Sequence, residues 1–319
     1  MNDATPALTR AADTARRAPS IHNTQPWRLV VAGSELEIRA EPSRHLTELD
    51  PDGHMMLVSC GAALHHAETA LAAEGWSVDV DRIAGMVGPV AHVRVTGHGE
   101  PDPTAVRRLA AISRRRTDRR PVPPEPVPAD ALAAVIRAVS GTGLRIHVLR
   151  RDQVVDLAVA VDHAIRAEGT DDRQRAELAG WVGGDRAAGT GVPDTSIPGE
   201  APQTTVPGRD FGVTGTLPPG AGHDESAVYA VVFGAGDTPV DWLRAGEALS
   251  AAWLDAVDSG LTLLPFSAPA EIASTRLLIQ RLVSNVGYPY LVVRLGVAPA
   301  DTVPDTPRLP AGETLEVRP

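Results

Sequence analysis

The sequence predicts an α+β fold in which mixed sheets are flanked by helices and two degenerate halves form an internal pseudo-dimer. Helical segments and short strands are interspersed without the strict strand–helix alternation of a doubly wound sheet. A helix, a connection and a strand at residues 6–31 have a counterpart at residues 130–149. The 319 residues are enough for two fused units with a sizeable core. We expect the halves to be residues 1–102 and residues 103–319.

The first half is expected to begin with a helix that ends before Pro19, because the residue before a proline is disfavoured in the α region. Two strands joined through Gly33 follow, and then a helix that is apolar on nearly all sides, which indicates an interior or an interface. The expected elements are a helix at 6–18, strands at 27–31 and 36–40, a helix at 54–74 and a strand at 90–95.

The second half contains recognisable helix starts. Asp130 can cap one helix, and Thr238 with Asp241 forms a capping box with Pro239 at the first helical position. The expected elements are helices at 104–113, 130–141, 152–168, 239–260 and 271–285, and strands at 144–149, 228–233, 261–264 and 291–295.

Residues 181–225 are rich in Gly, Pro and Thr and show no periodicity. Inside a compact protein, such a segment is either disordered or a functional loop that covers a site. Trp181, Arg209 and Phe211 within it favour an ordered lid.

The composition limits the partners and the chemistry. The net charge is −10, which argues against nucleic acid or an anionic membrane as the main partner. All 30 basic residues other than His are arginine, so a lysine Schiff base is excluded. The single cysteine, Cys60, excludes an intramolecular disulfide. No apolar run approaches the ~20 residues that span a bilayer, and no secretory signal is recognisable. We expect a soluble cytoplasmic protein.

Two polar clusters are candidate sites. The run RRRTDRR at 114–120 is either a solvated helix end or a phosphate clamp, because arginine forks match phosphate oxygens and the threonine hydroxyl adds a donor. The run PSIHNTQP at 19–26 is either an ordinary turn or a rigid loop that presents Ser20 and Asn23. His65, His66 and Glu68 do not converge on one helix face, so no metal site is expected.

Four motifs then occur in order. APSIHNTQPWRL (18–29) resembles the AP-S-x-x-N-x-QPW signature of the FMN-dependent nitroreductase superfamily, and RRRTDRRPV (114–122) resembles its flavin-phosphate motif. Residues 238–261 and GYPYLVVRLG (287–296) resemble the Acg-type branch, in which two nitroreductase units are fused. The resemblance covers almost the whole chain.

The resemblance implies an FMN at the seam between the halves. Arg115 and Thr117 would hold the phosphate end, with Arg294 contributing from the C-terminal strand, and Arg119 would lie towards the flavin N1–O2 edge. Arg116, in the same run, is also expected to bind the cofactor. The remaining implied contacts are with Pro19, Ser20, Ile21 and Asn23, which would line the flavin, and with Pro265, Phe266 and Ser267, whose backbone would approach flavin N5. No side chain is nominated as a catalytic acid or base. The family's usual Pro-x-Glu-Gly is replaced here by Pro265-Phe266-Ser267-Ala268.

The implied activity is hydride transfer from NAD(P)H through flavin N5 to an electron-poor small molecule, such as a nitroaromatic compound or a quinone. The alternative is a flavin-sequestering protein whose lid covers the FMN and prevents turnover. A cofactor-free anion-binding protein is a third possibility. An internal pseudo-dimer is compatible with a monomer.

Overall fold

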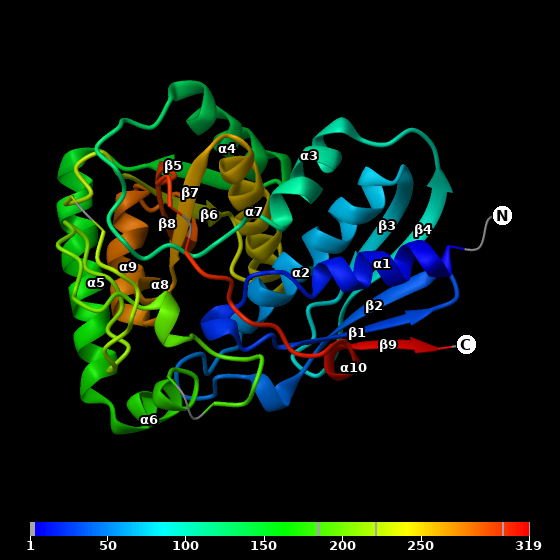
Figure 1. The fold of residues 1–319 in the computed structure, drawn as a ribbon, viewed down its shortest axis with the longest axis horizontal. Helices are drawn as coiled ribbons and strands as arrows, with labels where there is room; N and C mark the ends of the chain where they lie inside the picture. Colours follow the sequence, from blue (N-terminus) through cyan, green and yellow to red (C-terminus); the bar gives the residue numbers. More distant parts are fainter. Residues whose placement is uncertain (1–3, 184–185, 221, 302, 319) are drawn as a thin grey trace.

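Two β-sheets flanked by helices make up the computed structural model, which describes residues 4–183, 186–220, 222–301 and 303–318 (Figure 1). The first sheet has the order β3-β4-β2-β1-β9 and the second the order β5-β6-β8-β7. The strands are β1 Trp27–Ala32, β2 Glu35–Ala40, β3 Trp76–Arg82, β4 Gly88–His98, β5 Arg145–Val148, β6 Val228–Gly234, β7 Leu261–Phe266, β8 Tyr288–Val297 and β9 Leu315–Arg318. The predicted α+β class is confirmed.

The helices cover these sheets and fill the space between them. They are α1 Thr5–Ala15, α2 His54–Ala73, α3 Pro103–Ile112, α4 Ala129–Gly141, α5 Arg151–Thr170, α6 Asp172–Gly180, α7 Pro239–Asp258, α8 Ala268–Glu271, α9 Ala273–Leu282 and α10 Ala311–Thr314. Within the described ranges, no helix is both long and apolar enough to cross a bilayer.

The two sheets share one topology. In the first half the chain runs α1-β1-β2-α2-β3-β4, and in the second half α4, β5, β6, α7, β7 and β8 follow in the same order with the same strand neighbours. The second half differs by the long insertion between β5 and β6, which contains α5, α6 and the Gly/Pro-rich segment, and by helices α8 and α9 between β7 and β8. This shared topology supports the prediction of two degenerate halves.

Helices α2 and α7 hold the halves together at the centre of the molecule (Figure 1). They approach so closely that a Cβ on Gly61 would lie 1.9 Å from the carbonyl oxygen of Leu243, and a Cβ on Gly246 would lie 1.9 Å from that of Val58. Only glycine permits this backbone approach. One hydrophobic core includes α2, α7 and strands of both sheets, which explains why α2 is apolar on nearly all sides.

The end of the chain returns to the first sheet. After β8, the C-terminal arm (residues 298–314) crosses from the second sheet to the first, where β9 pairs in parallel with β1 from Leu29↔Leu315 onwards (Figure 1). The range expected for the second half, residues 103–319, thus supplies strand β9 to the first sheet. The boundary at residue 102 stays a prediction. The arm brings residues near Arg308 to the seam.

Several elements differ from those expected from the sequence. Strand β3 was missed although its sequence WSVDVDR alternates, and α6 and β9 were missed as well. Helix α1 ends at Ala15, three residues earlier than expected. The helix expected at 271–285 is α9, which covers only 273–282. The extended dihedrals of Ile272, φ −97° and ψ 122°, separate it from the unexpected short helix α8.

Candidate functional site

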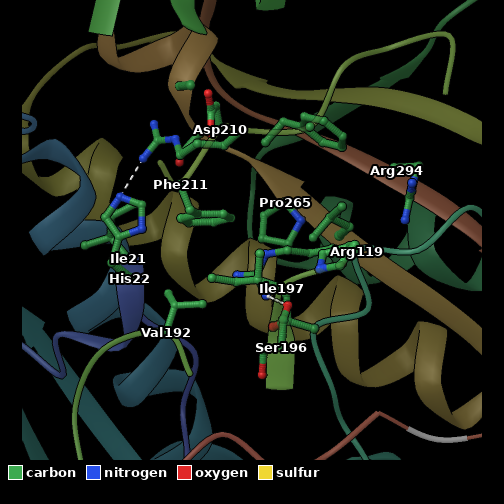
Figure 2. Close-up of a pocket in the computed structure, with 18 of the residues that line it drawn as sticks. Ile21, His22, Arg119, Val192, Ser196, Ile197, Asp210, Phe211, Pro265 and Arg294 are labelled. Carbon is green, nitrogen blue, oxygen red and sulfur yellow. Dashed lines mark hydrogen bonds between the residues drawn. The ribbon is translucent and has the colours of Figure 1, made fainter. Parts of the chain in front are cut away.

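A cavity of about 610 Å³ lies at the seam between the halves, within the range of roughly 300–1,000 Å³ that is typical of small-molecule sites (Figure 2). It is lined by the loop before β1, the arginine run, α7, the end of β7, the C-terminal arm and the Gly/Pro-rich segment. Of the predicted cofactor-binding residues, those that line it are Pro19, Ser20, Ile21, Asn23, Arg115, Thr117, Arg119, Pro265, Phe266, Ser267 and Arg294. Arg116 does not line this cavity.

The loop before β1 is held in a strained backbone conformation. His22, Asn23 and Gln25 have φ values of 42°, 55° and 51°, in the left-handed region that non-glycine residues rarely adopt. The Asn23 amide donates to the carbonyl oxygens of Gly191 at 3.1 Å and Pro307 at 2.9 Å. The loop therefore fastens both the Gly/Pro-rich segment and the C-terminal arm, a role that the sequence did not suggest.

Ser20 and Ile21 are fixed by local hydrogen bonds. The Ser20 hydroxyl accepts from the backbone N–H of Gln25 at 2.9 Å, and the Ile21 N–H donates to Ser59 Oγ on α2 at 3.1 Å. These bonds keep the wall that the loop contributes to the cavity in one position.

Three arginines at the cavity have no carboxylate within ion-pair distance in the part of the chain that the structure describes: Arg115, Arg119 and Arg308. Burial, reinforced by neighbouring arginines, lowers the pKa of Arg115 to about 9, and burial with the repulsion of Arg209 lowers that of Arg119 to about 10. Burial likewise lowers the pKa of Arg308 to about 10. The Arg115 side chain is buried, and those of Arg119 and Arg308 are half-buried. Cations withdrawn from water without a counter-charge are costly, so an anionic ligand would complement them.

The immediate surroundings of these arginines are partly aromatic. The Arg115 guanidinium lies 4.6 Å from the ring centroid of Trp253 on α7, and that of Arg119 lies 5.0 Å from the Phe211 ring. Arg119 also donates to the carbonyl oxygen of Ser196 at 2.9 Å (Figure 2). The Nε atoms of Arg115 and Arg308 are buried and have no hydrogen-bond partner among the described residues.

Arg294 lines the cavity, but its charge is already neutralised. It forms an ion pair of 2.7 Å with Asp224, and both side chains are buried. It also donates to the carbonyl oxygens of Asp118 and Arg120. The sequence could not reveal this pairing, which joins residues 70 positions apart.

Arg116 lies in a separate depression beside the cavity. Its guanidinium forms an ion pair of 2.8 Å with Asp305 and donates to the carbonyl oxygen of Ser113 at 2.8 Å. The arginine run is thus divided between two sites.

The described part of the Gly/Pro-rich segment covers the cavity, which favours the lid over disorder. Its residues between Val192 and Thr214 line the cavity, and Ile197 and Phe211 pack in a hydrophobic cluster with Leu178 of α6. Of the predicted lid at 181–225, residues 184, 185 and 221 lie outside the described residues.

Arg209 fastens the lid. Its Nη2 contacts carboxylate oxygens of Glu168 on α5 and Glu271 on α8, each at 2.8 Å, and its Nη1 donates to His22 Nε2 at 2.5 Å (Figure 2). All four side chains are largely buried. Burial and the nearby arginines hold the pKa of His22 well below its usual range, so the neutral ring accepts this bond. We call these four residues the lid clasp.

Glu168 titrates near neutrality. Burial raises its pKa to about 7, against the lowering effect of Arg209, and the neighbouring Glu271 raises it further. Arg209 thus faces the carboxylates of both Glu168 and Glu271 in a buried environment. Glu168 can therefore take up a proton near neutral pH.

The end of β7 forms the opposite wall. Pro265 is tolerated in this strand because β7 is the edge of the second sheet, paired on one side with β8. Ser267 precedes the short helix α8, which carries Glu271 of the lid clasp. No grouping of His, Cys, Asp and Glu able to hold a metal ion is found among the residues described.

Sequence reasoning did not assign four lining residues to the site, and it noted Arg209 only as a sign of an ordered lid. The four are His22, Ser59, Trp253 and Arg308. His22 and Trp253 lie inside the motifs at 18–29 and 238–261, so their position in the sequence could have identified them as site residues. Arg308 lies in a tail without periodicity, and its place depends on the pairing of β9 with β1.

Comparison with known proteins gives the family. No model of a protein family matches the chain. It is 38% identical over 94% of its length to a Mycobacterium tuberculosis H37Rv protein named "Putative NAD(P)H nitroreductase Rv3131", of which it covers 88%. It is 33% identical over 98% of its length to "Putative NAD(P)H nitroreductase acg" of the same strain, of which it covers 96%.

Solved structures are more distant. A nitroreductase with bound FMN from Bacteroides fragilis is 16% identical, with 64% of this chain and 95% of that chain covered and a TM-score of 0.39. The FMN- and NADPH-dependent nitroreductase NfnB, from an organism given as "sphigopyxis sp. strain HMH", is 15% identical over 66% of this chain and 99% of that chain, with a TM-score of 0.42. The identity to the mycobacterial proteins over nearly the whole length shows that the chain belongs to the nitroreductase family, in the branch that includes Acg.

Proposed function

We propose that the chain is an FMN-dependent oxidoreductase that takes hydride from NAD(P)H and passes it to an electron-poor small molecule, such as a nitroaromatic compound or a quinone. The observation that carries the proposal is that Arg115 and Arg308 line one part of a large cavity without a carboxylate partner among the described residues, each with a buried Nε atom that has no hydrogen-bond partner there. The names of its relatives, NAD(P)H nitroreductases, support the same reaction class.

The residues present fit FMN. The cavity is large enough for a small-molecule cofactor, and Ile21, Leu249 and Phe266 give it apolar walls. A phosphate monoester carries a charge of about −1.5 to −2 near pH 7 and offers several acceptor oxygens. It would supply the counter-charge that Arg115 and Arg308 lack, and acceptors for their orphaned Nε atoms.

In this assignment Arg115, Thr117 and Arg308 hold the phosphate, and Arg308 takes the part that the family resemblance gave to Arg294. When bound, the flavin supplies the hydride chemistry. The fixed cation of Arg119 favours negative charge on the reduced ring system. The rigid loop before β1 and the end of β7 orient the ring, and the lid excludes water from it.

The lid clasp favours a second candidate function, in which the chain binds FMN but does not turn it over. The lid lines the cavity and is fastened by the three buried partners of Arg209. A nicotinamide would need the lid to open before it could reach the ring.

Anaerobic mixing with NADPH distinguishes the two functions. If the chain is an oxidoreductase, the visible absorbance of its bound flavin should bleach promptly and return when a quinone is added. If the flavin stays oxidised in the wild type but bleaches in Arg209→Ala, the lid sequesters the cofactor and the turnover proposal is wrong. Reduction by dithionite serves as the control that the bound flavin is redox-competent in both proteins.

A further inference from the structure

Beside the cavity lies a second depression of about 320 Å³, and it is strongly basic. Arg16, Arg17, Arg115, Arg116 and Arg308 line it, against only two acidic residues among the described lining, Asp13 and Asp305. We call it the basic depression. The proposed FMN phosphate accounts for Arg115 and Arg308, but it does not account for Arg17, which lines the depression and not the cavity.

Two of these arginines have acidic partners within the depression. Arg16 pairs with Asp13, and Arg116 pairs with Asp305 at 2.8 Å. Arg17, Arg115 and Arg308 form no ion pair with any described residue, although Asp305 lies near enough to favour the charge of Arg115 and Arg308. Arg17 is exposed at the rim of the depression. Like charges this close repel, so a polyanion would stabilise the arrangement.

The basic depression and the main cavity share a wall. Arg115, Thr117, Thr306 and Arg308 line both of them. The proposed function places the flavin phosphate at this wall. A second phosphate linked to the first would therefore leave the cavity on the side where Arg17 and Arg116 lie.

We propose that the basic depression binds the adenylate half of a flavin dinucleotide, so that the chain accepts FAD as well as FMN. This inference rests on the proposed function. The depression is larger than a single phosphate needs and lies within the size range of small-molecule sites. Continuity with the flavin cavity through the shared wall favours a ligand joined to the cofactor over an independent anion.

The test compares two flavins on one protein. Flavin-free protein is titrated with FMN and with FAD, and the quenching of tryptophan fluorescence is followed because Trp253 lines the cavity. FAD should bind with a dissociation constant within about tenfold of that of FMN. Arg17→Ala should weaken FAD binding about three- to tenfold and FMN binding less than twofold, because Arg17 lines the depression and not the cavity.

Arg114→Ala is the matched control. Arg114 belongs to the same arginine run but is exposed, lines neither space and pairs with Asp258 at 3.5 Å. Its replacement should leave the ratio of the two dissociation constants unchanged.

The possible failures are distinguishable. If FMN saturates the protein and FAD does not bind at a hundredfold higher concentration, the inference is wrong and the proposed function stands. The inference also fails if Arg17→Ala weakens the binding of both flavins equally. If neither flavin binds, the proposed function fails and the inference fails with it.

Discussion

Replacing Arg209 with alanine should open the lid while the rest of the fold stays intact. The substitution leaves Glu168 and Glu271 buried without their shared cation and removes the donor to His22. Removing one partner of a buried ion pair costs about 3–5 kcal/mol, and the lower end applies here because Glu168 can take up a proton. Chymotrypsin should then cleave after Phe211, which is 8% exposed in the closed lid, at least tenfold faster than in the wild type.

Two variants control this experiment. Arg173→Ala removes an exposed arginine from α6, next to the lid, and should leave cleavage unchanged. Glu168→Gln should accelerate cleavage much less than Arg209→Ala, because the carboxyl group it replaces is partly protonated near neutrality and Glu271 still holds Arg209. Equal protection of Phe211 in Arg209→Ala and the wild type would show that the clasp does not fasten the lid.

Replacing Arg115 with alanine should weaken FMN binding by about 1.5–3 kcal/mol, which is roughly a 10- to 150-fold increase in the dissociation constant. The reason is the loss of a charge-assisted bond to the phosphate in a buried site. Arg308→Ala should have an effect of the same size, since both arginines lack a carboxylate partner among the described residues. The measurement is a fluorescence titration of flavin-free protein with FMN.

Riboflavin is the control ligand because it has the same ring system without the phosphate. Its affinity should change less than threefold in Arg115→Ala, whereas a misfolded cavity would weaken both ligands alike. Arg116→Ala should weaken FMN binding much less than Arg115→Ala, because Arg116 lies outside the cavity and pairs with Asp305. An unchanged FMN affinity in Arg115→Ala would remove this residue from the proposed phosphate site.

Local patterns predicted much of the fold. The all-round apolar run at α2 indicated a buried central helix, and the Thr238–Asp241 capping box marked the start of α7 within one residue. These features depend on neighbours within one or two turns. Strand β9 was not predictable in this way, because its pairing with β1 joins residues nearly 300 positions apart.

The site likewise combines features that the local sequence predicts with features that depend on contacts between distant segments. The loop at 19–26 and the arginine run carry motifs, and the structure brings both to one cavity. Which of Arg294 and Arg308 can serve as a phosphate ligand depends on which one already has an acidic partner. Arg294 has that partner in Asp224, and this contact joins distant parts of the chain. The left-handed conformations of His22 and Asn23 and the lid clasp likewise depend on contacts with distant segments.

Because each half supplies one part of the site, the account predicts how many FMN molecules one chain binds. Only the first half carries the elaborated loop, and only the second carries the arginine run, so the chain can assemble one complete site. The central claim is therefore tested most directly by the flavin content of the purified protein after reconstitution with FMN. We predict one FMN released per chain on denaturation. A protein that neither retains nor binds FMN, or that binds two per chain, would contradict this account.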